Sequence, residues 1–142
     1  MGRILGIDYG KKRTGLAASD PLRIIVSALE TVPTPQLFDH LRSYFEFEPV
    51  DQVVVGAPMG LDGQATDATP LVKTFIKQFK KQFPDIPITT YDERYSSKRA
   101  FDILLKSGIK QKKRRDKSLI DKVSAAVILQ DYMEAEGLFS NQ

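Results

Sequence analysis

Acidic side chains stand at three places in this sequence where a purely structural role is unusual. Asp8 ends an apolar run near the N-terminus, and Asp92 and Glu93 end a second run, "IPITTYDE". Asp121 lies among small and apolar residues of a C-terminal segment that is expected to be helical. Burying an unpaired charge is costly, so carboxylates in such positions need cations or hydrogen-bond donors beside them. If the three groups converge, they form an all-oxygen ligand set of the kind that Mg²⁺ and Mn²⁺ prefer.

Such a ligand set indicates phosphodiester chemistry. Two hard cations about 4 Å apart, bridged by one carboxylate, can activate a water molecule and stabilise the leaving oxygen of a phosphodiester. Asp8 is the expected bridge, because its strand is predicted to be central in the sheet. The sequence contains no cysteine, and His40, its one histidine, is expected to lie at the surface or in packing. The residues therefore predict cleavage of a nucleic-acid strand.

Each acid also has a structural interpretation. Asp8 could accept hydrogen bonds from turn amides, and Asp92 or Glu93 could pair with Arg94. Asp121 could be an acid in the first turn of a helix capped by Ser118, where the helix dipole favours it. Taken one at a time, these interpretations are about as good as a functional one. Together, three carboxylate groups at one crevice would need cations to neutralise them.

Positive charge is concentrated in one segment. Residues 94–122 hold eleven Lys and Arg against three Asp, although the net charge of the whole chain is only +3. A basic segment on an otherwise acidic body is typical of a protein that binds a polyanion, and a solvated loop is the alternative. The cations expected to contact substrate phosphates lie in this segment and in the turn after Asp8: Lys112, Lys113, Arg114, Arg115, Lys11, Lys12 and Arg13.

The spacing of apolar residues predicts an α/β fold. Strands are expected at residues 3–10, 14–20, 23–32, 51–56 and 86–93, and helices near 36–47, 70–83, 96–108 and 118–136. Two short connections imply an antiparallel meander, and the right-handed crossover rule places the fourth strand beside the first and the fifth beyond it. The result is a mixed five-stranded sheet, with three antiparallel strands followed by two parallel ones and helices on both faces. Asp8, the "GAPMG" loop and "YDER" fall at the carboxyl ends of the parallel strands, where ligands bind in such sheets.

The length and composition set further expectations. A chain of 142 residues is the size of one domain, which we expect to span residues 1–142. No apolar run is long enough to cross a bilayer, and the N-terminus lacks a signal-peptide pattern. We therefore expect a cytoplasmic protein that does not contact membranes.

Four motifs of the sequence resemble those of the YqgF (RuvX) family. They are "GIDYGKKRTGLA", "VVGAPMGLDG", "YDERYSS" and "DKVSAAVILQDY", and together they span essentially the whole chain in the family's order and spacing. Members are similar to RuvC-type Holliday junction resolvases. The resemblance implies an RNase H-like fold, a divalent-metal nuclease using one or two Mg²⁺ or Mn²⁺ ions, and a role in maturing the 5′ end of pre-16S rRNA.

The resemblance also assigns residues. The family's catalytic, metal-binding acids match Asp8, Glu93 and Asp121, and its arginine after the second acid matches Arg94. The loop after the fourth strand, with Gly56, Pro58 and Gly60, is expected on the substrate side of the crevice. Asp92 and Ser124 are expected beside the metal ligands. Ser124 departs from the resolvase pattern, which has a second aspartate at this place, so the site has one carboxylate fewer.

Other functions remain open at this point. The chain could be a Holliday junction resolvase that acts on branched DNA, or a non-catalytic RNA-binding module in ribosome assembly. Sugar kinases and actin-like ATPases share the fold and the first motif, but they need a second domain for which 142 residues leave no room. The expected partners are pre-rRNA or branched DNA and ribosomal precursor particles, and the protein is expected to be a monomer or a weak homodimer.

Overall fold

The computed structural model describes residues 2–57, 69–92 and 117–140. The strands are β1 (Arg3–Asp8), β2 (Arg13–Ser19), β3 (Val26–Pro33), β4 (Val50–Ala57) and β5 (Ile88–Asp92). The helices are the short 3₁₀ helix η1 (Thr34–Gln36), α1 (Leu37–Phe47), α2 (Thr69–Gln82) and α5 (Lys117–Ala135). The helix expected at residues 96–108 lies outside the described residues.

The five strands form one sheet in the order β3-β2-β1-β4-β5. β1 pairs antiparallel with β2, which pairs antiparallel with β3, whereas β1–β4 and β4–β5 are parallel. The predicted mixed sheet is therefore confirmed, including the central place of β1.

The third strand begins later than its predicted start at residue 23. The carboxylate of Asp20 accepts hydrogen bonds from the backbone N–H groups of Ile24 (2.7 Å) and Ile25 (3.0 Å). Arg23 has a φ of 58°, in the left-handed region. These features make residues 20–25 a turn, so only the last residue of the apolar run "RIIV", Val26, belongs to the sheet.

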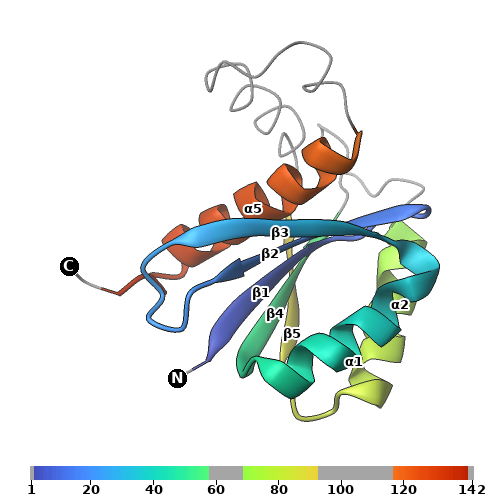
Figure 1. Ribbon diagram of the computed structural model, residues 1–142, viewed down its shortest axis with the longest axis horizontal. Coiled ribbons are helices and arrows are strands. Elements are labelled where there is room, and N and C mark those ends of the chain that lie inside the picture. The colour runs from blue at the N-terminus through green and yellow to red at the C-terminus, as the bar shows by residue number, and fades with distance from the viewer. Residues whose placement is uncertain (1, 58–68, 93–116, 141–142) are drawn as a thin grey trace.

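Helices cover both faces of the sheet, as the sequence predicted (Figure 1). On one face, α1 and α2 pack over a core that includes Leu5, Ile7 and Phe75. On the other face, α5 packs over Ile4 and Val54. Successive residues of β1 thus alternate between the two cores, as the pleat of a strand requires.

Helix α5 lies unusually close to the strands because two glycines face it. A Cβ atom on Gly6 would lie 2.8 Å from Cβ of Leu129, and one on Gly15 would overlap the backbone carbonyl oxygen of Asp121. Any larger residue at these positions would push the helix away from the sheet. Gly6 and Gly15 thus allow the helix to pack directly against the backbone of the sheet.

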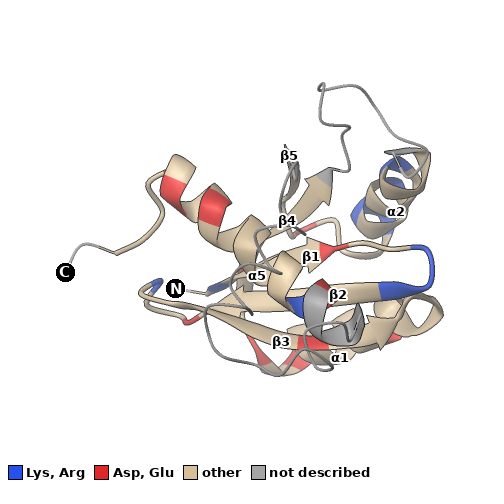
Figure 2. Ribbon diagram, turned by 90° about the horizontal axis from the view of Figure 1, so that it is seen from above, with Lys and Arg blue, Asp and Glu red and all other residues tan. Residues whose placement is uncertain are grey.

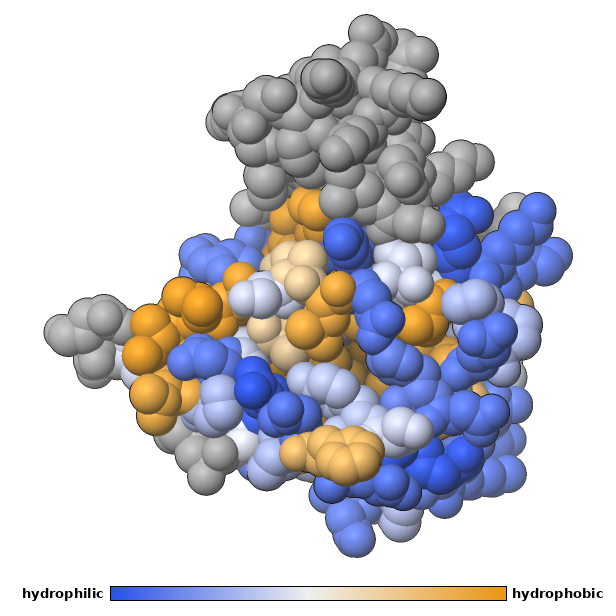
Figure 3. Space-filling view, viewed as in Figure 1, coloured by the Kyte–Doolittle hydropathy of each residue, from blue (hydrophilic) through white to orange (hydrophobic). Residues whose placement is uncertain are grey.

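Near the amino end of β1, the surface of the protein is apolar. The turn between β2 and β3 exposes Leu22, Ile24 and Ile25, and Figure 3 shows hydrophobic residues gathered at the end of the molecule near the C-terminus. The backbone N–H of Ser140 donates to the carbonyl of Arg23 (2.8 Å), which holds the C-terminal segment against this turn.

Among the described helices, none is both long and apolar enough to span a membrane.

Candidate active site at the carboxyl end of β1

The strand register places Asp8 next to the N-terminal half of α5. Asp8 is paired with Gly15 across the antiparallel β1–β2 ladder. Directly opposed residues of such a ladder point their side chains to the same face. Because the Cβ direction of Gly15 points at the backbone of Asp121, the half-buried Asp8 side chain also lies on the α5 face. Gly15 thus has Asp8 beside it in the sheet and Asp121 above it on the helix.

Asp121 is held by a cation from the sheet. Nε of Arg13 donates to Oδ2 of Asp121 at 3.0 Å, and the two side chains are 38% and 25% exposed. Arg13 and Gly15 are two residues apart on β2, so they share the face of the sheet that α5 covers. One predicted substrate-binding cation is therefore paired with one predicted metal ligand.

Asp121 lies in the second turn of α5. The helix begins at Lys117, and its first turn contains no acidic residue. The interpretation of Asp121 as a first-turn acid stabilised by the helix dipole is therefore wrong, since that effect fades beyond the first turn. The prediction that Asp121 shares a small, apolar face packed on the sheet is confirmed, because Ser124, Ala125 and Ile128 are all buried.

The turn between β1 and β2 presents two lysines at the same end of the sheet. Lys11 and Lys12 are exposed, and the turn is blue in Figure 2 beside the acidic end of β1. Thr34 fixes the turn: its Oγ1 donates to the carbonyl of Gly10 (2.6 Å), and its N–H donates to the carbonyl of Lys12 (3.0 Å). The hydroxyl of Thr14 also bonds to that of Thr34 at 2.9 Å. Sequence analysis missed this anchor, for which the motif gives no signal.

Ser124 adds a buried hydroxyl one helical turn beyond Asp121. Its side chain is fully buried, and its Oγ has no hydrogen-bond partner among the described residues. A buried polar atom without a partner is uncommon and points to a missing ligand or water. Two carboxylates and an orphaned hydroxyl supply oxygen ligands of the kind that a divalent metal ion prefers, and the Arg13 guanidinium shows that a cation is accepted beside Asp121.

The remaining predicted site residues divide between described and undescribed segments. Gly56 is buried near the end of β4, and Asp92 ends β5 opposite Ala57. Glu93, Arg94, Pro58, Gly60 and the cations at positions 112–115 lie outside the described residues. Within the described part of the chain, no three acidic or imidazole side chains gather as a metal site. Asp8 and Asp121 both adjoin Gly15, one through the strand ladder and the other through the helix backbone, and Glu93 is not described.

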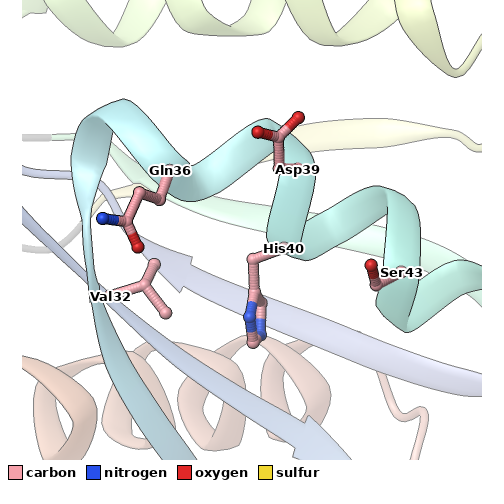
Figure 4. A pocket seen from close by; sticks show the side chains of 5 residues that line it. All are labelled: Val32, Gln36, Asp39, His40 and Ser43. Carbon is pink, nitrogen blue, oxygen red and sulfur yellow. The ribbon is translucent and has the colours of Figure 1, made fainter.

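Two other groups with possible chemistry lie away from the carboxylates. Tyr9 stacks on Phe75 at a centroid distance of 4.6 Å on the α2 face, and burial raises the pKa of its hydroxyl. His40 lies on α1, where its Nε2 is 3.0 Å from Oε1 of Glu30. A cavity of about 410 Å³ beside α1 is lined by His40, Asp39 and three other residues (Figure 4). His40 therefore lies partly exposed on the α1 face of the sheet, in keeping with the surface or packing position expected for it.

Comparisons with known proteins show what the chain is similar to. A family model described as "RuvX: Holliday junction resolvase" matches residues 2–135. A protein of Porphyromonas gingivalis named "Putative pre-16S rRNA nuclease" is 48% identical over 134 residues, covering 94% of this chain and 97% of that protein. A Flavobacterium johnsoniae protein of the same name is 44% identical and covers 96% and 99% of the two chains.

A solved structure extends the comparison to the fold. Thermus thermophilus RuvC in complex with a Holliday junction substrate aligns with a TM-score of 0.55 at 18% identity, covering 96% of this chain and 97% of that one. At this identity the likeness concerns the fold alone, and the fold is that of RuvC, which is RNase H-like.

Proposed function

The chain belongs to the RuvX (YqgF) family, and from this premise we propose that it is a divalent-metal-dependent endonuclease that matures the 5′ end of pre-16S rRNA. The family and the fold are those of phosphodiester hydrolases. The observation that carries the proposal is the position of Gly15 between Asp8 and Asp121. Asp8 and Asp121 lie on either side of this one glycine, and their carboxylate oxygens are ligands of the kind that Mg²⁺ and Mn²⁺ prefer.

Asp8, Asp121 and Glu93 are the residues that would hold one or two Mg²⁺ or Mn²⁺ ions, with Ser124 beside them. A divalent cation held there supplies a Lewis acid that activates water and offsets the charge of the phosphate. The matching family positions and the donor set around Gly15 support this assignment.

The chain's own cations orient the substrate. Lys11 and Lys12 stand on a turn that Thr34 holds in place, so the backbone of this turn need not be ordered when the lysines meet a phosphate group. Gly56, Pro58, Gly60 and Arg94 would line the substrate side. The basic run at positions 112–115 would add contacts that are independent of base sequence.

A second candidate function is the resolution of branched DNA. It is favoured by the description of the family model and by the fold shared with RuvC. Junction resolution needs two sites acting on paired strands, whereas cleavage of an RNA leader needs one. A protein that is monomeric in solution would therefore favour RNA, and precursor ribosomal particles would then be its partners.

One cleavage assay separates these functions. Purified protein is incubated with a pre-16S 5′ leader, an unrelated single-stranded RNA and a four-way DNA junction, each with Mg²⁺, Mn²⁺ or EDTA. We expect metal-dependent cleavage of the leader at a defined position. Cleavage of the junction alone would favour resolution, and binding of the leader without cleavage in any metal would leave a non-catalytic RNA-binding module.

A further inference from the structure

We infer that Arg13 is the resident counter-ion of Asp121, and that a divalent cation displaces it when the site is filled. The inference rests on the proposed function, because it takes Asp121 as a cation ligand. Its basis is the bond from Nε of Arg13 to Oδ2 of Asp121 at 3.0 Å. Both side chains are partly buried, so the pair is formed where solvent screens it only in part.

The guanidinium and the divalent cation compete for the same carboxylate. A hard cation coordinates an oxygen at about 2 Å, which would place it beside the guanidinium. Repulsion between the two cations at that separation exceeds what a partly exposed ion pair contributes. Arg13 therefore leaves Asp121 when the metal ion binds. The long side chain of Arg13 can turn outward, whereas the short side chain of Asp121 cannot.

Arg13 is placed so that its guanidinium can bind a substrate phosphate after it leaves Asp121. Arg13 opens β2 directly after the exposed pair Lys11 and Lys12. Once released, its planar fork can bind a phosphate group through two donors. Binding of the cation thus creates a phosphate contact, which couples filling of the site to capture of the substrate.

The chain offers a matched control for this pair. Nε of Arg3 donates to Oε2 of Glu48 at 2.9 Å, with exposures of 27% and 38%, and Arg3 begins β1 at the opposite end of the strand. The full chain is titrated with Mg²⁺ alone, and the Nε–Hε signals of both arginines are followed by NMR, assigned from Arg13→Gln and Arg3→Gln. We expect the Arg13 signal to change with saturation while the Arg3 signal stays fixed. An Arg13 signal that is unchanged at saturating Mg²⁺ would overturn the inference.

Calorimetry supplies a second readout. Arg13→Gln should bind Mg²⁺ roughly two- to five-fold more tightly than the wild type, the equivalent of one partly exposed ion pair, and Arg3→Gln should bind it as the wild type does. Equal or weaker binding by Arg13→Gln contradicts the inference. If Mg²⁺ does not bind the wild type, or binds Asp8→Asn equally well, both the inference and the proposed function fail. If Asp8→Asn weakens binding while Arg13→Gln does not strengthen it, the inference alone fails.

Release toward phosphate is tested without metal. In EDTA, Asp121→Asn frees Arg13, so a single-stranded RNA oligonucleotide should bind this variant more tightly than the wild type. That gain should be smaller when Arg13→Gln is also present. Equal gains in both backgrounds would mean that Arg13 does not pass to the phosphate.

Discussion

Gly15 of β2 and Asp121 of α5 are in contact so close that a Cβ atom on Gly15 would overlap the Asp121 carbonyl oxygen. The contact sets the height of the helix above the sheet at the point where Asp8 faces it. The spacing of the candidate metal ligands thus depends on the absence of a side chain between them.

The first prediction concerns this contact. Gly15→Ala should destabilise the protein by about 3 kcal/mol or more, at or above the upper end for overpacking, because the opposing atom is backbone and cannot turn away. Gly137→Ala is the control: it has a φ of 65° and nothing within 4 Å, so only backbone strain of about 1–2 kcal/mol applies. Urea unfolding measures both, and equal losses would mean that moving α5 away costs no more than the backbone strain at Gly137, which would contradict the prediction.

The second prediction concerns catalysis. Asp8→Asn keeps the shape of the side chain and removes the charge that would hold a cation. Cleavage should fall by at least about 100-fold, beyond the usual loss for a residue that only supports a ligand, while RNA binding in EDTA persists. Asp39→Asn, which changes a carboxylate 86% exposed on α1, should leave both unchanged. Retained cleavage by Asp8→Asn would remove this residue from the site.

The third prediction uses the orphaned hydroxyl of Ser124. Ser124→Ala should leave stability unchanged or raise it by up to about 1 kcal/mol, because this hydroxyl makes no hydrogen bond to a described residue that the change could remove. Ser124→Asp should lower the melting temperature in EDTA, since it buries a charge, and Mg²⁺ should restore it by supplying a cation. A deficit that Mg²⁺ does not reduce would place Ser124 out of reach of the metal site.

The fourth prediction concerns the basic run at positions 112–115, which remains a prediction from the sequence alone. Replacing these four residues with serine should weaken binding to all single-stranded RNAs alike. The slope of log affinity against log salt should flatten by about 0.7 for each phosphate that the variant no longer neutralises. Replacing the four exposed lysines of α2 is the matched control in charge. An equal effect of both replacements would mean that net charge alone matters.

The fifth prediction concerns pH and the turn between β2 and β3. Backbone N–H groups of Ile25 and Ile24 lower the pKa of Asp20. A carboxyl group whose pKa is lowered by folding stabilises the protein above its unfolded pKa of about 3.9 and loses that effect as pH falls through the folded value. Asp20→Ala should therefore melt below the wild type at pH 7, and the difference should shrink in acid. A constant difference would assign the effect to the shape of the turn.

Much of the architecture could be predicted from the sequence, because it is encoded locally. The apolar run around Leu5 and Ile7 predicted a buried strand, and the helical spacing of Phe75 and Phe79 predicted a helix. Short connections and the handedness of crossovers then placed the strands in order. The same order puts Asp8 at the end of a central strand. The late start of β3 was missed, because the side chain of Asp20 supplies a turn within an apolar run.

The contacts within the site were decided only by the tertiary structure. Arg13 and Asp121 are 108 residues apart, and their pairing depends on the register of β2 and the height of α5, neither of which has a local signature. The role of Gly15 could not be predicted either, because a glycine in a glycine-rich motif can allow close approach of a substrate or of a helix. Side-chain chemistry and local periodicity determine which elements form and which residues can react. Only packing, which brings distant backbones into contact, decides which reactive residue faces which.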